Sequence, residues 1–264
     1  YKFFRDNIPL IVCLMLMHII VKKIACYGLK IDKTRFDFGF GLFFLFAAHG
    51  VNSLRIMCHL IIMYSIPHIF KRNRRLAVLL SWTYGISTLF INDKYRAFPF
   101  GNIVGFLAPL DNAYKGIIPR WDVFFNFTIL RMLSYDMDFL ERWSNRLQNT
   151  QTVAANEAAS RPDMKKRPST PTLETIQESG TALILDERAR MVAPHHIQDY
   201  NFVNYVAYVA YTPLLIAGPI ITFNDFLYQS RHTLPSINMT QIFSYAVKLT
   251  VSILTMELLL HYTY

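Results

Sequence analysis

Four polar side chains within one apolar stretch of this sequence share the spacing of a single helix face. They occupy positions i, i+3, i+4 and i+7 of the stretch Trp121–Phe139, as Arg131, Ser134, Tyr135 and Asp138. Ionisable groups inside such a stretch are costly to bury, so each is a candidate for function. Two interpretations stay open. Arg131 lines a polar cavity together with Asn126, or it forms an internal ion pair with Asp138 and nothing is bound.

The stretch Phe202–Phe223 carries a second polar pattern. Its hydroxyl groups recur every three or four residues, at Tyr205, Tyr208, Tyr211 and Thr212. Pro213 and the pair Gly218–Pro219 then interrupt the helix. Backbone groups freed by such a break are tolerated inside a membrane only where protein or water satisfies them. The pattern therefore indicates either the wall of a cavity or a Pro kink in a packed bundle.

Other polar groups form weaker patterns. A turn is expected near Gly50–Arg55, and it would separate four side chains that a continuous helix aligns: His49, Asn52, Arg55 and His59. Glu257 and His261 are spaced i, i+4 and are able to share a hydrogen bond. The cysteines have no metal spacing, and no zinc signature or Gly-rich phosphate loop occurs. No metal site and no bound cofactor are expected.

The elements that position these side chains follow from the composition. Of 264 residues, 53% are hydrophobic, 15% are aromatic and only 17% are charged. Soluble domains usually carry about 25% charged residues. The deficit argues against an ordinary soluble enzyme, and the composition also excludes a disordered chain, a collagen and a disulfide scaffold. The net charge of +9 indicates either nucleic acid or basic loops beside a membrane.

Seven apolar runs decide between these alternatives. They are Ile8–Val21, Phe36–Val51, Ile56–Phe70, Leu76–Ile91, Trp121–Phe139, Phe202–Phe223 and Ile242–Thr263. A membrane-spanning helix needs about 20 mostly apolar residues, and the last three runs approach that length. Seven such runs in one chain predict an all-α integral membrane protein, a multi-span helical bundle with about seven spans.

The basic residues suggest an orientation. If the N-terminus is luminal and all seven runs cross, the inner loops 22–35, 71–75 and 141–196 hold 17 Lys and Arg in 75 residues. The outer segments hold 7 in 54. Positive charge favours the cytosolic side. The net charge is therefore interpreted as a topology signal, and no nucleic-acid partner is expected.

Three regions are predicted. Residues 1–143 hold spans one to five, with the connector 92–120 either dipping into the membrane interface or forming an ordered surface loop. Residues 144–196 are polar and are predicted as a mostly disordered cytosolic loop, with a short helix near Ala182–Arg190. Residues 197–264 hold spans six and seven.

Two segments carry a resemblance to a known family. RWDVFFNFTILRMLSYDMDF (120–139) and YTPLLIAGPIITF (211–223) are similar to the membrane-bound O-acyltransferase family, in its hedgehog-acyltransferase-like branch. The resemblance covers nearly all of the chain except about 144–183. It implies a helical fold around a tunnel through the membrane, with acyl transfer from acyl-CoA at the cytosolic face to a luminal hydroxyl. Fungal members of this branch imply a lipid or glycosylphosphatidylinositol-anchor acceptor and an endoplasmic reticulum location, with the plasma membrane as a second one.

One departure from the family limits what this chain is expected to do. The family's catalytic His follows a Trp on an apolar helix, and no Trp-His pair occurs here. The catalytic residues are therefore expected beyond Tyr264, and both ends look cut, so the chain alone is expected to be inactive. Within it, the expected substrate-pocket residues are Asn126, Arg131, Tyr211 and Pro219.

Two other functions stay open as alternatives. A polyol (glycerol)–proton symporter is suggested by the ionisable residues Arg131, Lys248 and Glu257 inside apolar runs, although no internal repeat supports it. A non-catalytic membrane scaffold is the third alternative.

Overall fold

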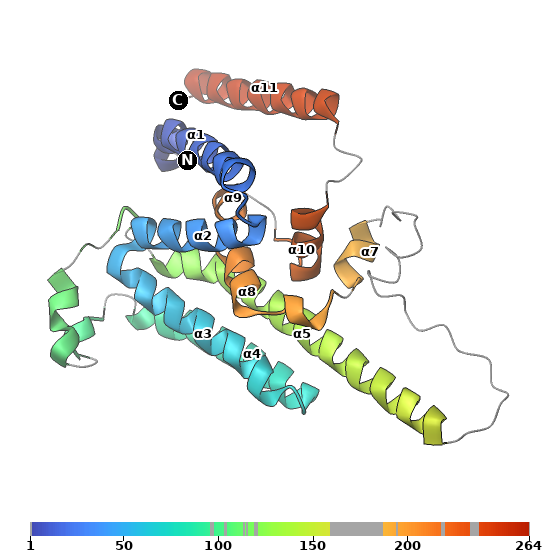
Figure 1. The fold of residues 1–264 in the computed structure, drawn as a ribbon. Helices are drawn as coiled ribbons and strands as arrows, with labels where there is room; N and C mark the ends of the chain where they lie inside the picture. Colours follow the sequence, from blue (N-terminus) through green and yellow to red (C-terminus); the bar gives the residue numbers. More distant parts are fainter. Residues whose placement is uncertain are drawn as a thin grey trace.

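The computed structural model describes residues 2–95, 98–102, 105–112, 114, 116–118, 121–158, 187–193, 195–217, 220–232 and 238–263. All regular structure in these ranges is helical, which confirms the predicted all-α class. Four long helices form the centre: α2 (Lys33–His49), α3 (Ser53–Phe70), α4 (Arg74–Tyr95) and α5 (Trp121–Ala158). The helices α3, α4 and α5 pack against one another, while the short α8 (Phe202–Val209) contacts both α2 and α5 (Figure 1).

The helix boundaries follow from local chemistry. The Asp32 side chain accepts hydrogen bonds from the backbone N–H groups of Thr34 and Arg35, at 3.2 and 3.4 Å, and so caps the N-terminus of α2. Gly50, with φ of 54°, ends that helix. The chain then turns through Gly50–Asn52 into α3, at the position where the sequence predicts a turn.

The connector 92–120 is tied to this turn. The Val51 N–H donates to the Tyr114 carbonyl at 2.9 Å, and the Ile118 N–H donates to the Ala48 carbonyl at 2.8 Å. Gly116 lies between them with φ of 88°, where a Cβ atom would stand 2.4 Å from the Ala48 carbonyl oxygen. The described part of the connector is therefore ordered, with short helical turns at Phe100–Asn102 and Gly105–Asn112. Its depth in a bilayer stays a prediction.

The sixth apolar run does not form one continuous helix. It divides into α8 and α9 (Thr212–Ala217), and α10 (Phe223–Arg231) follows. The break falls where Pro213 lacks an N–H group, because a proline fits only the first turn of a new helix.

The two ends of this segment lie together. Arg231, the last residue of α10, forms an ion pair with Asp199, before α8, with nitrogen–oxygen distances of 2.9 and 2.5 Å. The prediction that run 202–223 crosses from one side of the bundle to the other is therefore wrong. The run enters and returns on one side.

Helix α5 runs past residue 144, where the polar loop is predicted to begin. Helix α5 continues to Ala158, where seven of the twelve residues 147–158 are Ala, Gln, Glu or Leu, which favour helices without needing apolar burial. A short helix, α7 (Glu187–Val192), lies close to the one expected over Ala182–Arg190. Residues 159–186, most of the loop predicted as disordered, lie outside the described residues.

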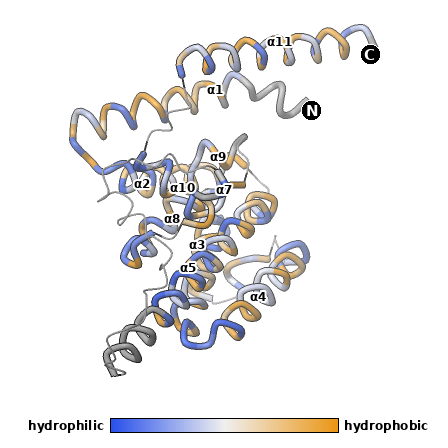
Figure 2. The backbone as a smooth tube through the Cα atoms, turned by 90° about the vertical axis from the view of Figure 1, so that its right-hand side faces the viewer, coloured by the Kyte–Doolittle hydropathy of each residue, from blue (hydrophilic) through white to orange (hydrophobic). Residues whose placement is uncertain are grey.

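Two helices lie over the central bundle. Figures 1 and 2 both show α1 (Lys2–Lys23), which ends in a π-helical turn at Ile24–Gly28, running beside α11 (Met239–Thr263). By length and composition, two stretches of the described residues could cross a membrane: Lys33–Phe70, which takes in α2 and α3, and Met239–Tyr262. The number of membrane spans stays a prediction, except that the sixth run, 202–223, does not cross from one side of the bundle to the other.

Candidate functional site

Four side chains of α5, which we call the polar stripe, face the segment 197–231, which we call the broken segment. The stripe consists of Arg131, Ser134, Tyr135 and Asp138. Arg131 is 3% exposed and donates from one terminal nitrogen to the Leu214 carbonyl at 2.6 Å. Its other terminal nitrogen lies 3.5 Å from the carbonyl of Val209, the last residue of α8. The guanidinium therefore supplies donors to carbonyl groups at the α8–α9 break, where a continuous helix would have supplied backbone N–H groups.

The other members of the stripe bind the same segment. The Tyr135 hydroxyl donates to the Tyr200 carbonyl at 2.9 Å. Asp138 accepts from the Asn224 N–H at 3.1 Å, and Ser134 lies 3.4 Å from the Phe223 nitrogen. All four side chains share one face, as the i, i+3, i+4, i+7 spacing predicts. The alternative of an Arg131–Asp138 ion pair is wrong, because each group instead meets backbone groups of the broken segment.

Asn224 is the centre of a second polar cluster. Its side-chain oxygen accepts from the Tyr200 hydroxyl at 2.7 Å, and its backbone carbonyl accepts from Nε2 of His195 at 2.8 Å. Its side-chain nitrogen donates to the Met191 carbonyl at 3.3 Å. Burial lowers the pKa of His195, so that at neutral pH the ring is uncharged. Burial also raises the pKa of the Tyr200 hydroxyl, which therefore stays protonated as a donor.

Ion pairs hold the returning end of the segment. Arg190 of α7 donates to Asp225 at 2.9 Å, and both side chains are largely buried. The hydrogen bond from Arg231 to Asp199 raises the pKa of the Arg231 guanidinium. The broken segment is thus fixed at its entry, its middle and its exit.

Three buried polar atoms around the break have no hydrogen-bond partner among the described residues. They are Arg131 Nε, the Tyr205 hydroxyl and Thr212 Oγ1. Leaving such a group unpaired costs about 1–3 kcal/mol, and exceptions of this kind call for an explanation. Two of these atoms, Arg131 Nε and Thr212 Oγ1, belong to residues at the α8–α9 break, so the break offers polar atoms to a polar group of a ligand.

Of the four expected pocket residues, the three that the structure describes are not brought together. Tyr211 lines a cavity of about 500 Å³ between α1, α2 and the start of α9. Arg131 is not among the residues that line this cavity, and it donates instead to the Leu214 carbonyl of α9. Asn126 is exposed on α5 and lies five positions before Arg131, on a different helix face. Pro219 lies outside the described residues.

The sequence analysis missed several polar groups. His18 is buried and lines the Tyr211 cavity. Asp37 is also buried, and Lys22 donates to both of its carboxylate oxygens at 2.7 Å. Ser81 donates to the buried Asp136 at 2.7 Å, which joins α4 to α5. The signal was present, because His18, Asp37 and Asp136 are ionisable residues within apolar runs, as Arg131 is.

The side chains of His49, Arg55 and His59, which a continuous helix would align, are separated from one another in the structure. His49 packs on Phe124, with ring centroids 4.5 Å apart, while Nδ1 of His59 hydrogen-bonds the Tyr84 hydroxyl at 2.7 Å. Arg55 instead lies over the Phe100 ring, 4.2 Å from its centroid. Across the described ranges, no three His, Cys, Asp or Glu side chains converge as metal ligands do.

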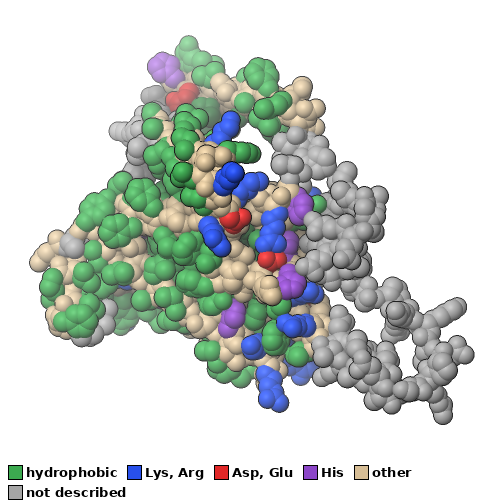
Figure 3. Space-filling model, in the orientation of Figure 1, with side chains coloured by type: hydrophobic (Ala, Val, Ile, Leu, Met, Phe, Trp, Pro, Cys, Tyr) green, Lys and Arg blue, Asp and Glu red, His purple; other side chains and the backbone are tan. Residues whose placement is uncertain are grey.

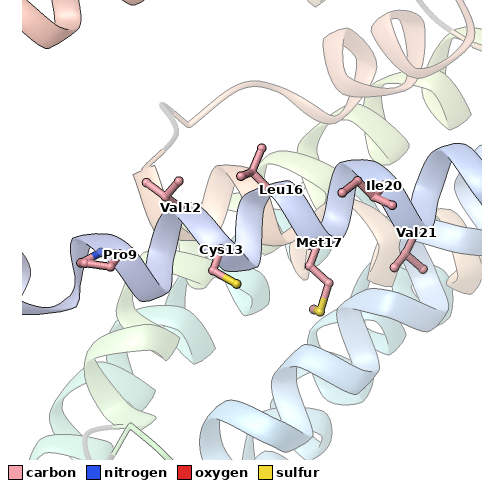
Figure 4. A pocket seen from close by; sticks show the side chains of 7 residues that line it. All are labelled: Pro9, Val12, Cys13, Leu16, Met17, Ile20 and Val21. Atoms are coloured by element: carbon pink, nitrogen blue, oxygen red, sulfur yellow. The ribbon is translucent and has the colours of Figure 1, made fainter.

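A second hollow is lined by apolar side chains. It has a volume of about 620 Å³ and is lined from α1 alone, by Pro9, Val12, Cys13, Leu16, Met17, Ile20 and Val21. Figure 4 shows these side chains along one length of that helix. The surface suits contact with lipid chains or with another apolar helix.

Comparison with known proteins gives the family. A family model described as the membrane-bound O-acyltransferase family matches residues 76–264. The chain is 57% identical over 262 residues to membrane-bound O-acyltransferase GUP1 of Saccharomyces cerevisiae, covering 99% of this chain and 43% of that protein. It is 50% identical to GUP2 of the same yeast, covering 100% of this chain and 43% of that protein. It is 41% identical to GUP1 of Candida tropicalis, covering 100% of this chain and 41% of that protein.

The chain thus spans less than half the length of these relatives. No solved structure matches it. The family match covers both the polar stripe of α5 and the broken segment that the stripe holds. The chain belongs to the membrane-bound O-acyltransferase family.

Proposed function

We propose that this chain is the part of a membrane O-acyltransferase that builds one wall of the substrate tunnel. The complete protein would transfer a long acyl chain from acyl-CoA to a hydroxyl group of a lipid or of a glycosylphosphatidylinositol anchor. The membership of the family supports the reaction class. The donor, the acceptor and a location in the endoplasmic reticulum are proposals that follow from the resemblance.

The observation that carries the proposal is the broken segment held by α5. A chain that enters a helical bundle, breaks and returns must satisfy its backbone groups with other protein groups, and Arg131, Tyr135 and Asp138 do this. The unpaired atoms Arg131 Nε and Thr212 Oγ1 remain at the break. Fixed donors of this kind can stabilise charge on a reacting ester or thioester.

This chain does not supply a general base in our proposal. Acyl transfer to a hydroxyl needs a group that removes the proton, most often a His. His195 donates to the Asn224 carbonyl and is buried, so it has a packing role. We place the base in the part of the relatives' length that this chain does not cover.

The corrected sixth run gives a proposed topology. With the N-terminus luminal, runs one to five cross, the segment 197–231 returns to the cytosolic side, and α11 crosses next. The broken segment then faces the side from which acyl-CoA would arrive. The basic loops 22–35 and 71–75 remain on that side.

Reconstitution tests the proposed reaction. The full-length protein would be placed in liposomes with labelled long-chain acyl-CoA and a lipid that carries a free hydroxyl, and the acyl product would be measured. Transfer of the label to the hydroxyl lipid is expected. Proton-coupled glycerol flux without acyl transfer would instead establish the symporter. Arg131 weighs against that alternative, because it binds the backbone carbonyls of Val209 and Leu214 and forms no ion pair with a carboxylate among the described residues.

A further inference from the structure

The cavity that Tyr211 lines has a charged end and an apolar end. Its charged lining is His18, Lys22, Lys23 and Lys33, from α1 and the N-terminus of α2. Its apolar lining includes Met15, Ile19 and Pro213. The consecutive helices α1 and α2 therefore build this site together with α9, which lies far along the chain.

His18 points to a ligand in this cavity. Its side chain is 4% exposed, and neither ring nitrogen has a hydrogen-bond partner among the described residues. The nearest carboxylate oxygen, on Asp37, lies 4.0 Å from Nε2, beyond hydrogen-bond distance. A buried polar group with no partner is unfavourable unless something else satisfies it.

The charge balance of the cavity is positive. Lys22 is neutralised by Asp37, because its ammonium group contacts both carboxylate oxygens at 2.7 Å. The other nearby acid, Asp32, caps the N-terminus of α2 and is not among the residues that line the cavity. Lys23 and Lys33 are both exposed at the rim, so two positive charges face whatever enters. An anion is the complementary ligand.

The apolar lining of the cavity indicates which class of anion fits it. Met15, Ile19 and Lys22 follow one another on one face of α1, so the surface passes from apolar to basic along the helix. Figure 3 shows basic side chains, with acidic ones among them, gathered near the centre of this face and hydrophobic side chains to their left. A small free anion uses only the basic end, whereas a phospholipid uses both, with its phosphate at the lysines and its chains along α1.

We propose that this cavity binds a membrane phospholipid with an anionic headgroup. The headgroup phosphate meets Lys23 and Lys33, with His18 as a further hydrogen-bond donor inside. This lipid is a bound component of the protein, distinct from the donor and acceptor of acyl transfer. The proposal does not depend on the reaction proposed above.

Binding is tested on the full-length protein in nanodiscs or detergent, by titration with phosphatidylserine and with phosphatidylcholine. The variant Lys23→Gln/Lys33→Gln removes two rim charges from exposed positions. Each basic group near an anionic lipid surface contributes about 1 kcal/mol, so phosphatidylserine is expected to bind about 10- to 30-fold more weakly. The control Arg72→Gln/Arg74→Gln removes two exposed charges from another basic loop and is expected to leave the affinity unchanged.

Alkylation of native cysteines locates the lipid. Cys26 lines the cavity, whereas Cys13 lines the separate hollow on α1, so phosphatidylserine should slow alkylation of Cys26 and leave Cys13 unaffected. Equal weakening in both double variants would overturn the proposal, since it would mean diffuse attraction. Unchanged affinity in Lys23→Gln/Lys33→Gln would also overturn it. So would displacement of the lipid by inorganic phosphate, because the site would then be one for a free anion.

Discussion

Arg131 provides the sharpest test of how the broken segment is held. Replacing it by Met keeps most of the side-chain volume and removes both donors. The contact to Leu214 is short at 2.6 Å, whereas the contact to Val209, at 3.5 Å, is at the limit of hydrogen bonding. Most of the effect should therefore come from the Leu214 carbonyl.

The magnitude follows from two opposing terms. Leaving buried carbonyl groups without a donor costs about 1–3 kcal/mol for each group, and the Leu214 contact is charge-assisted. Part of this loss is recovered, because the variant no longer has to bury a cation. We expect Arg131→Met to destabilise the protein by about 2 kcal/mol and Arg131→Lys, which keeps one donor, by about 1 kcal/mol.

The assay is thermal unfolding of the full-length protein in detergent, followed by intrinsic fluorescence. The matched control is Asn126→Ala, an exposed position on the same helix, where a change within about 0.5 kcal/mol is expected. If Arg131→Met unfolds at the same temperature as Asn126→Ala, the guanidinium does not hold the break and the reasoning is refuted.

Two further predictions concern the connector and the second polar cluster. Gly116→Ala should destabilise the protein by more than about 1 kcal/mol, because φ is 88° and the new Cβ atom meets Ala48 at 2.4 Å; an unchanged unfolding temperature beside Gly39→Ala, where nothing lies within 4 Å of the added atom, would contradict this. The pKa of His195 is lowered in the folded protein, so below its ordinary value of about 6.5 the unfolded chain binds the extra proton and stability falls as pH decreases. Unfolding temperatures measured between about pH 5 and 7.5 should fall less with acidity in His195→Gln, and an identical pH dependence in variant and parent would refute the assignment.

The sequence predicted the polar stripe but not its partners. Spacing alone placed Arg131 and Asp138 on one face, since helical periodicity is a local property. What each side chain binds depends on where a distant segment returns, and the backbone groups of Val209, Leu214 and Asn224 leave no pattern in side-chain types. An ion pair was therefore the natural but incorrect expectation.

Hydropathy likewise predicted the helices more reliably than their course. The run Phe202–Phe223 is long and apolar enough for a span, and Pro213 alone did not indicate whether the chain would kink or turn back. The ion pair between Asp199 and Arg231 carries that information, and it joins residues 32 positions apart. The continuation of α5 to Ala158 was missed for a different reason, because a polar sequence can still be helical where its residues favour the helix.

In the proposed topology, the broken segment enters and leaves on one side of the membrane. Single variants Asp199→Cys and Arg231→Cys of the full-length protein would be labelled in sealed vesicles of known orientation with a membrane-impermeant thiol reagent. We expect both positions to react from the cytosolic side and neither from the lumen, because their side chains form an ion pair at 2.5 Å. Labelling of the two positions from opposite sides would contradict the account.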